Sequence, residues 1–150
     1  MKKTLLIVVA VLITSAAYAK TPLKIIHSCT TTTGKQLAVY RQGNDYIYSF
    51  GRKGRKPELT FRNPKKDVLT RSGNSTKNGT SGMWGEMSME NKGYEYNVFW
   101  RVNQDRGHTL SYGVEVSKIS EKNNLNYSAP EIFCDKRYPI IRNTEPEFMI

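Results

Sequence analysis

Three glutamates are the residues best suited to a chemical reaction. Glu86, Glu95 and Glu115 lie in segments where polar and apolar residues alternate, so each is expected on a β-strand. Glycoside hydrolysis requires two carboxyl groups held close together, and neighbouring strands could supply such a pair. A glutamate that faces outward and pairs with Arg101 or with a lysine across the sheet is a more ordinary arrangement. We therefore predict no catalytic residue and interpret the protein as a non-enzyme, with a secreted hydrolase as the alternative.

The histidines and cysteines show no spacing typical of a catalytic or metal site. His27 and His108 stand apart in the sequence, and neither belongs to an HExxH motif. Cys29 and Cys134 are the only cysteines, and in an oxidising compartment two cysteines normally join. We therefore predict a disulfide between them, no metal site and no cofactor. The alternative is a reactive cysteine paired with one of the histidines.

A cluster of basic residues marks one predicted turn. The segment 51–61 reads GRKGRKPELTF, and its only acidic residue is Glu58. Clustered like charges repel one another, and a complementary surface would relieve that repulsion. One interpretation is a solvated hairpin whose charges prevent edge-to-edge pairing of strands. The other is a docking surface for an acidic protein partner, formed by Arg52, Lys53, Arg55 and Lys56.

The first 19 residues are typical of a secretory signal peptide. Two lysines precede an apolar run from Leu5 to Ile13, and the small-residue sequence Ala17-Tyr18-Ala19 follows it. The run is too short to span a bilayer, which takes about 20 residues, so we predict no membrane anchor. The shortness of the peptide and its paired lysines are typical of bacteria, which indicates the periplasm. The exported domain would comprise residues 20–150 and carry a net charge of +8.

Several aromatic residues could anchor a partner or stack on the bases of a nucleic acid. Affinity for a protein partner would need aromatic anchors close to the basic turn, and the candidates are Tyr46, Tyr48 and Trp84. The two tyrosines and Trp84, with Phe50 and Trp100, could instead stack on bases. Alternation also marks these aromatics as core residues, and an export signal argues against nucleic acid. We predict a protein partner and no nucleic acid.

A period of two runs through the exported domain and predicts an all-β fold. Alternating runs have one apolar and one wetter face, as half-buried antiparallel strands do. Seven or eight short strands at regular spacing indicate a β-sandwich or a flattened barrel in a single domain. The clearest alternating runs are residues 37–40, 46–50, 83–89, 94–102 and 110–116.

Turns and loops are expected between these runs. Gly43-Asn44 predicts a tight hairpin, and residues 91–93 predict a three-residue hairpin loop with Gly93 in the left-handed conformation. Residues 72–82, SGNSTKNGTSG, are small and polar and predict a mobile loop. Residues 120–126 hold at most one helical turn. Residues 137–150 contain two prolines and are expected to trail from the fold as a loosely ordered tail.

The order of these features resembles that of small periplasmic proteins of Gram-negative bacteria. The shared layout is an early cysteine, YRQGNDYIYSFG at 40–51, PELTF at 57–61, a hairpin-rich middle and a late cysteine. It is similar to two groups, the periplasmic lysozyme inhibitors and the immunity proteins that protect type VI secreting bacteria from periplasmic effectors. The resemblance implies a protein that neutralises a cell-wall-acting enzyme.

Two observations separate these groups. Inhibitors of c-type lysozymes carry a Ser-Gly-rich loop followed by a tyrosine, but no tyrosine promptly follows Ser72-Gly73 or Ser81-Gly82, so no lysozyme-binding site is assigned. Lysozymes of that type are basic, and an inhibitor with a charge of +8 would be repelled by them. We therefore predict an immunity protein against a type VI effector. The alternatives are a lysozyme inhibitor and a binder of anionic envelope lipid or glycan.

Overall fold

Ten strands and two short 3₁₀ turns make up the part of the chain that the structure, a computed structural model, describes, namely residues 21–77, 80–103, 107 and 109–142. In chain order the elements are β1 (Lys24–Thr30), β2 (Lys35–Gln42), β3 (Asp45–Arg52), β4 (Leu59–Pro64), η1 (Lys65–Asp67), β5 (Leu69–Lys77), β6 (Thr80–Asn91), β7 (Tyr94–Asn103), β8 (Thr109–Lys118), η2 (Ile119–Glu121), β9 (Glu131–Phe133) and β10 (Ile141–Arg142).

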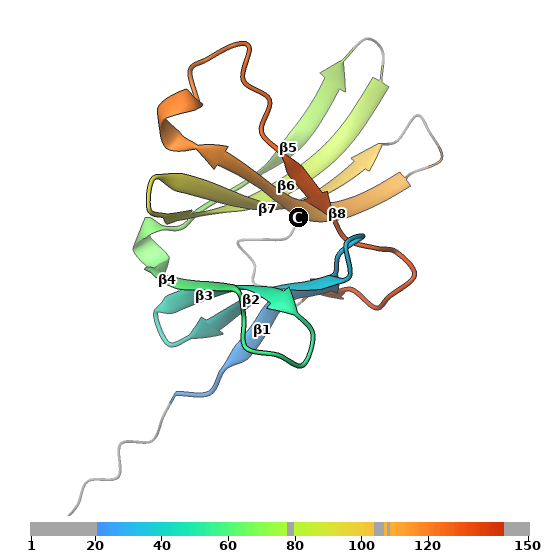
Figure 1. Cartoon of the computed structure of the whole chain (residues 1–150). Coiled ribbons are helices and arrows are strands. Elements are labelled where there is room, and N and C mark those ends of the chain that lie inside the picture. The colour runs from blue at the N-terminus through green and yellow to red at the C-terminus, as the bar shows by residue number, and fades with distance from the viewer. Residues whose placement is uncertain (1–20, 78–79, 104–106, 108, 143–150) are drawn as a thin grey trace, which may run out of the picture.

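These strands form two antiparallel sheets that face each other (Figure 1). The first sheet has the order β10-β1-β2-β3-β4, and the second has the order β5-β6-β7-β8-β9. Strands that follow one another in sequence are mostly neighbours, because short hairpins join them. The predicted all-β sandwich with one disulfide is confirmed.

The core lies between the sheets and is made of the apolar faces that alternation predicts. Tyr48 of β3 packs on Phe61 of β4 and on Tyr96 of β7, with ring centroids 4.9 and 5.1 Å away. This aromatic group therefore connects the first sheet to the second. Gly85 of β6 has no room for a side chain, because a β-carbon there would overlap the indole of Trp100. Gly85, which lies between Met83 and Met87 on the inner face of β6, thus makes space for the indole of Trp100.

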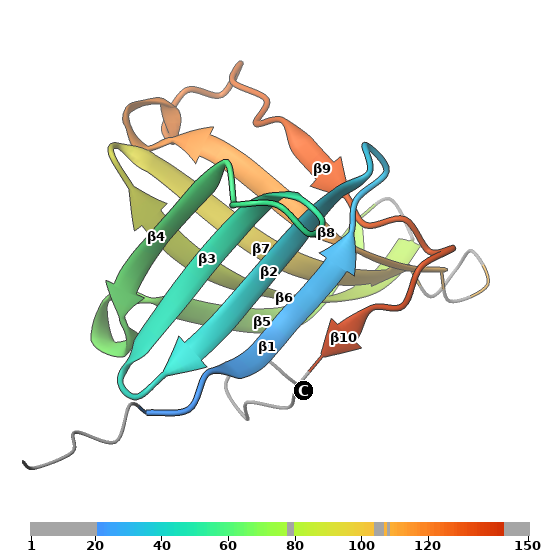
Figure 2. The same ribbon diagram turned by 60° about the horizontal axis from the view of Figure 1, so that its bottom comes forward.

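Contacts at two seams hold the sheets together along their sides. At one seam the Asn63 side chain of β4 donates to the carbonyl of Glu90 and accepts from its amide, both at 3.0 Å. At the other seam the amide of Thr32 donates to the carbonyl of Phe133, and Cys134 forms a β-bridge with Thr31. Figure 2 shows the first sheet lying across the second, with β9 near the end of β1. The architecture is thus a sandwich with partly closed sides.

The prediction of a mobile loop at residues 72–82 is wrong. Described residues on either side of positions 78 and 79 belong to a β-hairpin, in which Ser72 of β5 faces Gly85 of β6 and Lys77 faces Thr80. Ladder hydrogen bonds use backbone groups, so small polar residues can continue a strand beyond the core. The prediction failed because it counted apolar side chains and ignored pairing with the strongly alternating β6.

Two further expectations need correction. The loop between β6 and β7 has two residues, Lys92 and Gly93, with φ of 50° and 80°, which is the conformation of a tight primed turn. The chain after residue 137 does not simply trail, because Ile141 and Arg142 pair with Ser28 and His27 of β1. The remaining tail, residues 143–150, and the predicted signal peptide, residues 1–19, lie outside the described residues. No helix among the residues described is long and apolar enough to cross a membrane.

Candidate docking surface

The basic turn, defined as residues 52–58 between β3 and β4, has a fixed backbone. The amide of Glu58 donates to the carbonyl of Phe50 at 2.9 Å, and the amide of Arg55 donates to the carbonyl of Arg52 at 3.2 Å. Gly54 has a φ of 74°, which favours glycine. Gly51 is buried, and a β-carbon there would lie 2.7 Å from the amide nitrogen of Glu58. Both glycines therefore let the chain fold back sharply and display the residues between them.

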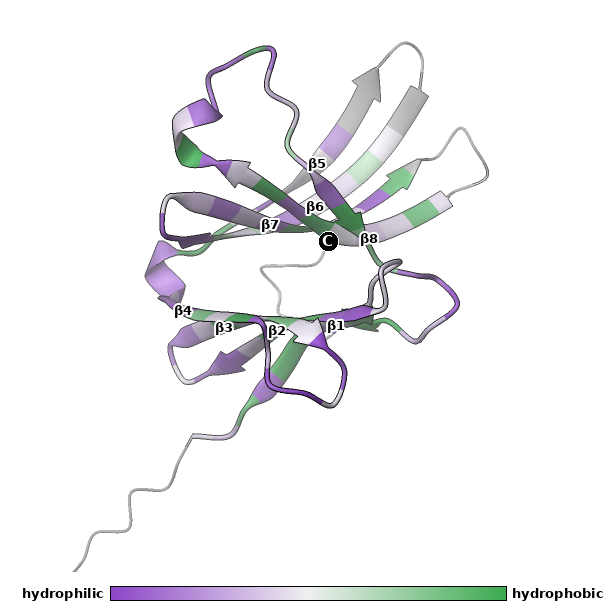
Figure 3. Cartoon of the chain, in the orientation of Figure 1, coloured by the Kyte–Doolittle hydropathy of each residue, from purple (hydrophilic) through white to green (hydrophobic). Residues whose placement is uncertain are grey.

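All four predicted cations are exposed on this turn. Figure 3 shows the loop between β3 and β4 as hydrophilic along its length. Within the described part of the chain, none of the four makes an ion pair. Glu58, the nearest acid in sequence, is instead 2.5 Å from the Nζ atom of Lys35. The basic turn therefore keeps its positive charge directed at solvent. The exposed cations are Arg52, Lys53, Arg55 and Lys56.

Other residues at the same end of the first sheet were not predicted. Lys35 opposes Arg52 across β2 and β3, so its ammonium group is a neighbour of the turn. A second turn is attached there, because the amide of Asp135 donates to the carbonyl of Thr30 at the end of β1. This second turn presents Tyr138, whose side chain is half-exposed. Its attachment depends on the distant Cys134, which explains why local sequence reasoning missed it.

The three predicted aromatic anchors do not lie at the basic turn. Tyr46 and Tyr48 are each only 1% exposed, because their apolar face of β3 packs between the sheets, and neither can contact a partner in this structure. Trp84 belongs to β6 in the other sheet, where its ring lies over Gly73. None of the three is therefore brought to the basic turn, and their assignment as anchors is corrected. Tyr138 is a half-exposed aromatic residue at the same end of the first sheet as the basic turn.

The three glutamates considered for catalysis separate into two places. Glu86 forms an ion pair with Arg71 at 2.5 Å, on the outer face of β5 and β6. Glu95 and Glu115 line a groove of about 650 Å³ on the outer face of the second sheet, beneath the segment 119–131. Glu131 of β9 also lines this outer groove and faces Glu115 across the ladder. The sequence reasoning missed Glu131 because β9 has only three residues.

Cations and amides surround the acids of the outer groove. Glu95 is buried and forms an ion pair with Lys122, and its Oε1 atom accepts a hydrogen bond from Asn97 at 3.0 Å. Arg101 lies between the other two acids, bonded to Glu131 and 3.4 Å from Glu115. The guanidinium of Arg101 also covers the ring of Phe99. This network attaches the segment 119–131 to the sheet.

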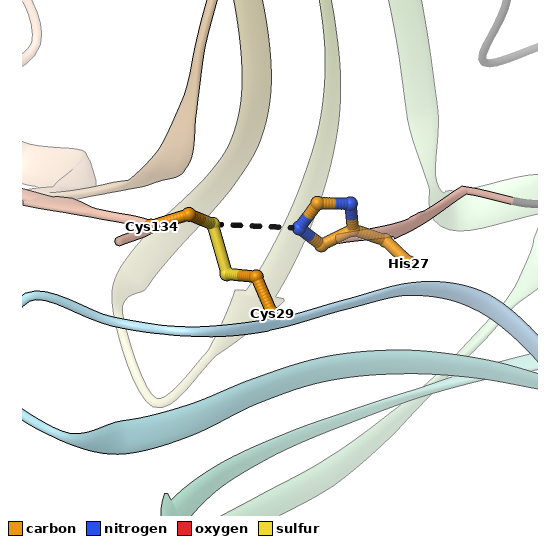
Figure 4. Close-up of side chains that lie close together, drawn as sticks. All are labelled: His27, Cys29 and Cys134. Carbon is orange, nitrogen blue, oxygen red and sulfur yellow. Dashed lines mark hydrogen bonds between the residues drawn. A yellow bond between two sulfur atoms is a disulfide. The ribbon is translucent and has the colours of Figure 1, made fainter. Parts of the chain in front are cut away.

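The predicted disulfide joins Cys29 of β1 to Cys134 just after β9, and its sulfur atoms are buried beside His27 (Figure 4). The Nε2 atom of His27 lies 3.9 Å from the Sγ atom of Cys134. Burial, with a smaller contribution from the charge of Arg142, lowers the pKa of His27 to about 4. Both sulfurs are bonded, so the alternative of a reactive cysteine does not apply to this oxidised form.

Comparison with known proteins gives no match: no family model fits the sequence, and no curated protein or solved structure is significantly similar to the chain. The resemblance to periplasmic inhibitors and immunity proteins therefore remains a prediction. Among the described residues, the basic turn and the outer groove are the two surface features that bear on function.

Proposed function

We propose that this protein binds and neutralises a cell-wall-acting enzyme in the periplasm, and that it is an immunity protein against a type VI secretion effector. The observation that supports this proposal most is the basic turn, where four exposed cations have no ion pair among the described residues. An acidic surface on the partner would complement them. The protein acts by binding, and performs no reaction of its own.

The hydrogen-bonded backbone of the basic turn favours a role in binding. A loop whose backbone is already hydrogen-bonded loses little conformational freedom when a partner docks. Unpaired cations also attract an acidic partner over several ångströms, which raises the rate of encounter. Tyr138 and Lys35 would extend the contact, because both lie at the same end of the first sheet. The partner's cleft would then be covered by this end of the sandwich.

The outer groove is the observation that favours the alternative, a carboxylate-based hydrolase. Glu95, Glu115 and Glu131 line it together, and two carboxyl groups are what a glycosidase requires. Each of these acids is already paired with Lys122 or Arg101, and Glu95 is buried. None of the three is therefore left unpaired to act on a substrate. We therefore propose that the ion pairs of the groove hold the segment 119–131 on the sheet and take no part in catalysis.

The test begins with the partner. The tagged protein is recovered from periplasmic extracts of its own bacterium, and a bound peptidoglycan-cleaving enzyme is identified by mass spectrometry and purified. We expect a stoichiometric amount of the protein to abolish that enzyme's hydrolysis of peptidoglycan. Recovery of no such enzyme, or an enzyme that stays fully active when bound, would contradict the proposal.

Matched variants then locate the surface. The triple variant Lys53→Glu, Arg55→Glu and Lys56→Glu should abolish protection. A control with the same change in net charge, Lys66→Glu, Lys92→Glu and Lys118→Glu, alters exposed lysines away from the basic turn and should protect normally. Equal loss of protection in both variants would show that only the net charge of the protein matters, and not the basic turn. Binding of vesicles of anionic lipid by the wild type, lost at high salt, would favour the envelope-binding alternative.

A further inference from the structure

The disulfide end of the core places three side chains of metal-binding types together. Ligand atoms of His27, Cys29 and Cys134 all lie within 4.8 Å of one another, and all three residues are buried. They come from β1 and from the segment after β9, which are 105 positions apart in the sequence. The fold itself therefore assembles this group.

We propose that the reduced protein binds one zinc ion through His27, Cys29 and Cys134. Thiolate sulfur and imidazole nitrogen are the donors that zinc prefers, and three protein ligands leave a fourth position for water. Around a tetrahedral zinc ion, with Zn–S of about 2.3 Å and Zn–N of about 2.0 Å, neighbouring N and S donors lie about 3.6 Å apart. The Nε2 atom of His27 is already 3.9 Å from the Sγ atom of Cys134.

Only the two cysteine side chains need to move for a zinc ion to bind with this geometry. Two sulfurs bound to one tetrahedral zinc ion lie about 3.8 Å apart, a separation that rotation of the two cysteine side chains can reach once the bond between them is broken. The Cα atoms, 5.8 Å apart, can keep their positions. Two thiolates and a neutral imidazole also cancel the charge of Zn²⁺, so the buried site carries no net charge.

The chemistry balances with a dithiol as the reductant. The dithiol supplies two electrons and two protons to the Cys29–Cys134 bond and itself becomes a cyclic disulfide. Zinc then displaces the two thiol protons, which are released to solvent. The metal and the disulfide are thus alternative links between the same two segments. The inference does not depend on the proposed immunity function.

The experiment compares oxidised and reduced protein under anaerobic conditions. The reductant is a phosphine, which supplies the two electrons and becomes a phosphine oxide with oxygen taken from water, because a dithiol would itself bind zinc. Zinc is titrated against a chromophoric chelator, and Co²⁺ is used as a spectroscopic probe of thiolate ligands. We expect one zinc ion per reduced chain and a thiolate-to-cobalt charge-transfer band, with neither in the oxidised protein. The same titration in denaturant should lose the tight binding, because the cysteines then lie far apart.

Variants decide whether the three named residues form the site. His27→Gln should weaken zinc binding at least about tenfold, a loss typical of altered zinc sites. His108→Ala, the matched control at the other histidine, should have no effect. Cys29→Ser with Cys134→Ser measures adventitious surface binding. If the reduced chain unfolds, zinc should restore its β-sheet circular dichroism. Unchanged affinity in the His27 variant, no zinc uptake, or binding that persists in denaturant would overturn the proposal.

Discussion

The basic turn and the outer groove differ in whether their charged side chains form ion pairs. In the turn, four cations face solvent with no ion pair among the described residues. In the groove, Glu95, Glu115 and Glu131 each have a cationic partner, and Glu95 is buried. Charges that are satisfied inside the molecule support its structure, whereas unsatisfied charges remain available to another molecule. We therefore expect substitutions in the groove to change stability and substitutions in the turn to change binding.

Removing the disulfide should have the largest effect, and it should loosen the end that carries the basic turn. Cys29→Ser with Cys134→Ser opens a loop of 105 positions, which is expected to cost about 4 to 5 kcal/mol in the free energy of unfolding. Urea denaturation measures this loss. Hydrogen exchange should show the amides of Thr32 and Asp135 losing protection before Asn97 beneath the groove. Equal loss of protection at both places would show that the disulfide stabilises the basic end and the groove alike.

Acid should also act on the disulfide end. The pKa of His27 is about 4, so between pH 6.5 and pH 4 the unfolded chain binds a proton that the folded chain does not. The free energy of unfolding should therefore fall as pH is lowered through this window, by about 3 kcal/mol in total.

The measurement is urea denaturation at several pH values, with His27→Gln as the comparison, because carboxyl groups also titrate at the lower end. The variant should lose most of the slope between pH 6.5 and pH 5. If the variant does not fold, the histidine proton resonances of the wild type give the pKa directly. A value near 6.5 would contradict the assigned burial.

Breaking one ion pair of the outer groove should cost less. Lys122→Ala leaves the buried carboxylate of Glu95 without its cation, and since Lys122 is partly exposed we expect a loss of about 2 kcal/mol. Lys118→Ala alters a neighbouring exposed lysine and should change stability by less than about 0.5 kcal/mol. Thermal or urea unfolding measures both. Partner binding should be unchanged in both variants, and its loss in Lys122→Ala would assign the groove to the interface.

Reversing the basic turn should have the smallest effect on stability. Exposed charges away from structural contacts usually contribute within about 0.5 kcal/mol, so Lys53→Glu, Arg55→Glu and Lys56→Glu should leave the urea midpoint nearly unchanged. A large loss of stability in this variant would indicate a structural role for the turn and would remove the contrast with the groove.

Local sequence patterns predicted the features that depend on neighbouring residues. The alternating faces of β3 and β7, the tight turn at Gly43-Asn44 and the exposed basic turn all follow from residues close in sequence. The disulfide was predicted because the sequence has only two cysteines and its first 19 residues resemble a signal peptide, which predicts an oxidising compartment. These features required no knowledge of how the two sheets lie.

Features that depend on pairing between segments were missed. The polar strand β5 exists because β6 pairs with it, and β9 is too short to show alternation. Glu131 reaches the groove only through its pairing with β8. Tyr138 reaches the basic end because the segment around Cys134 is attached to the end of β1 by the disulfide and by backbone hydrogen bonds. In each case the position of a residue was determined by contact with another segment and not by alternation within its own.

The most direct test of the central claim is the association rate of the identified partner enzyme, measured by stopped flow at low and high salt. If the basic turn steers an acidic partner, reversing Lys53, Arg55 and Lys56 should slow association at least about tenfold at low salt, and the two proteins should approach the same rate at high salt. An association rate that is the same for both proteins at low salt would show that the basic turn does not dock the partner.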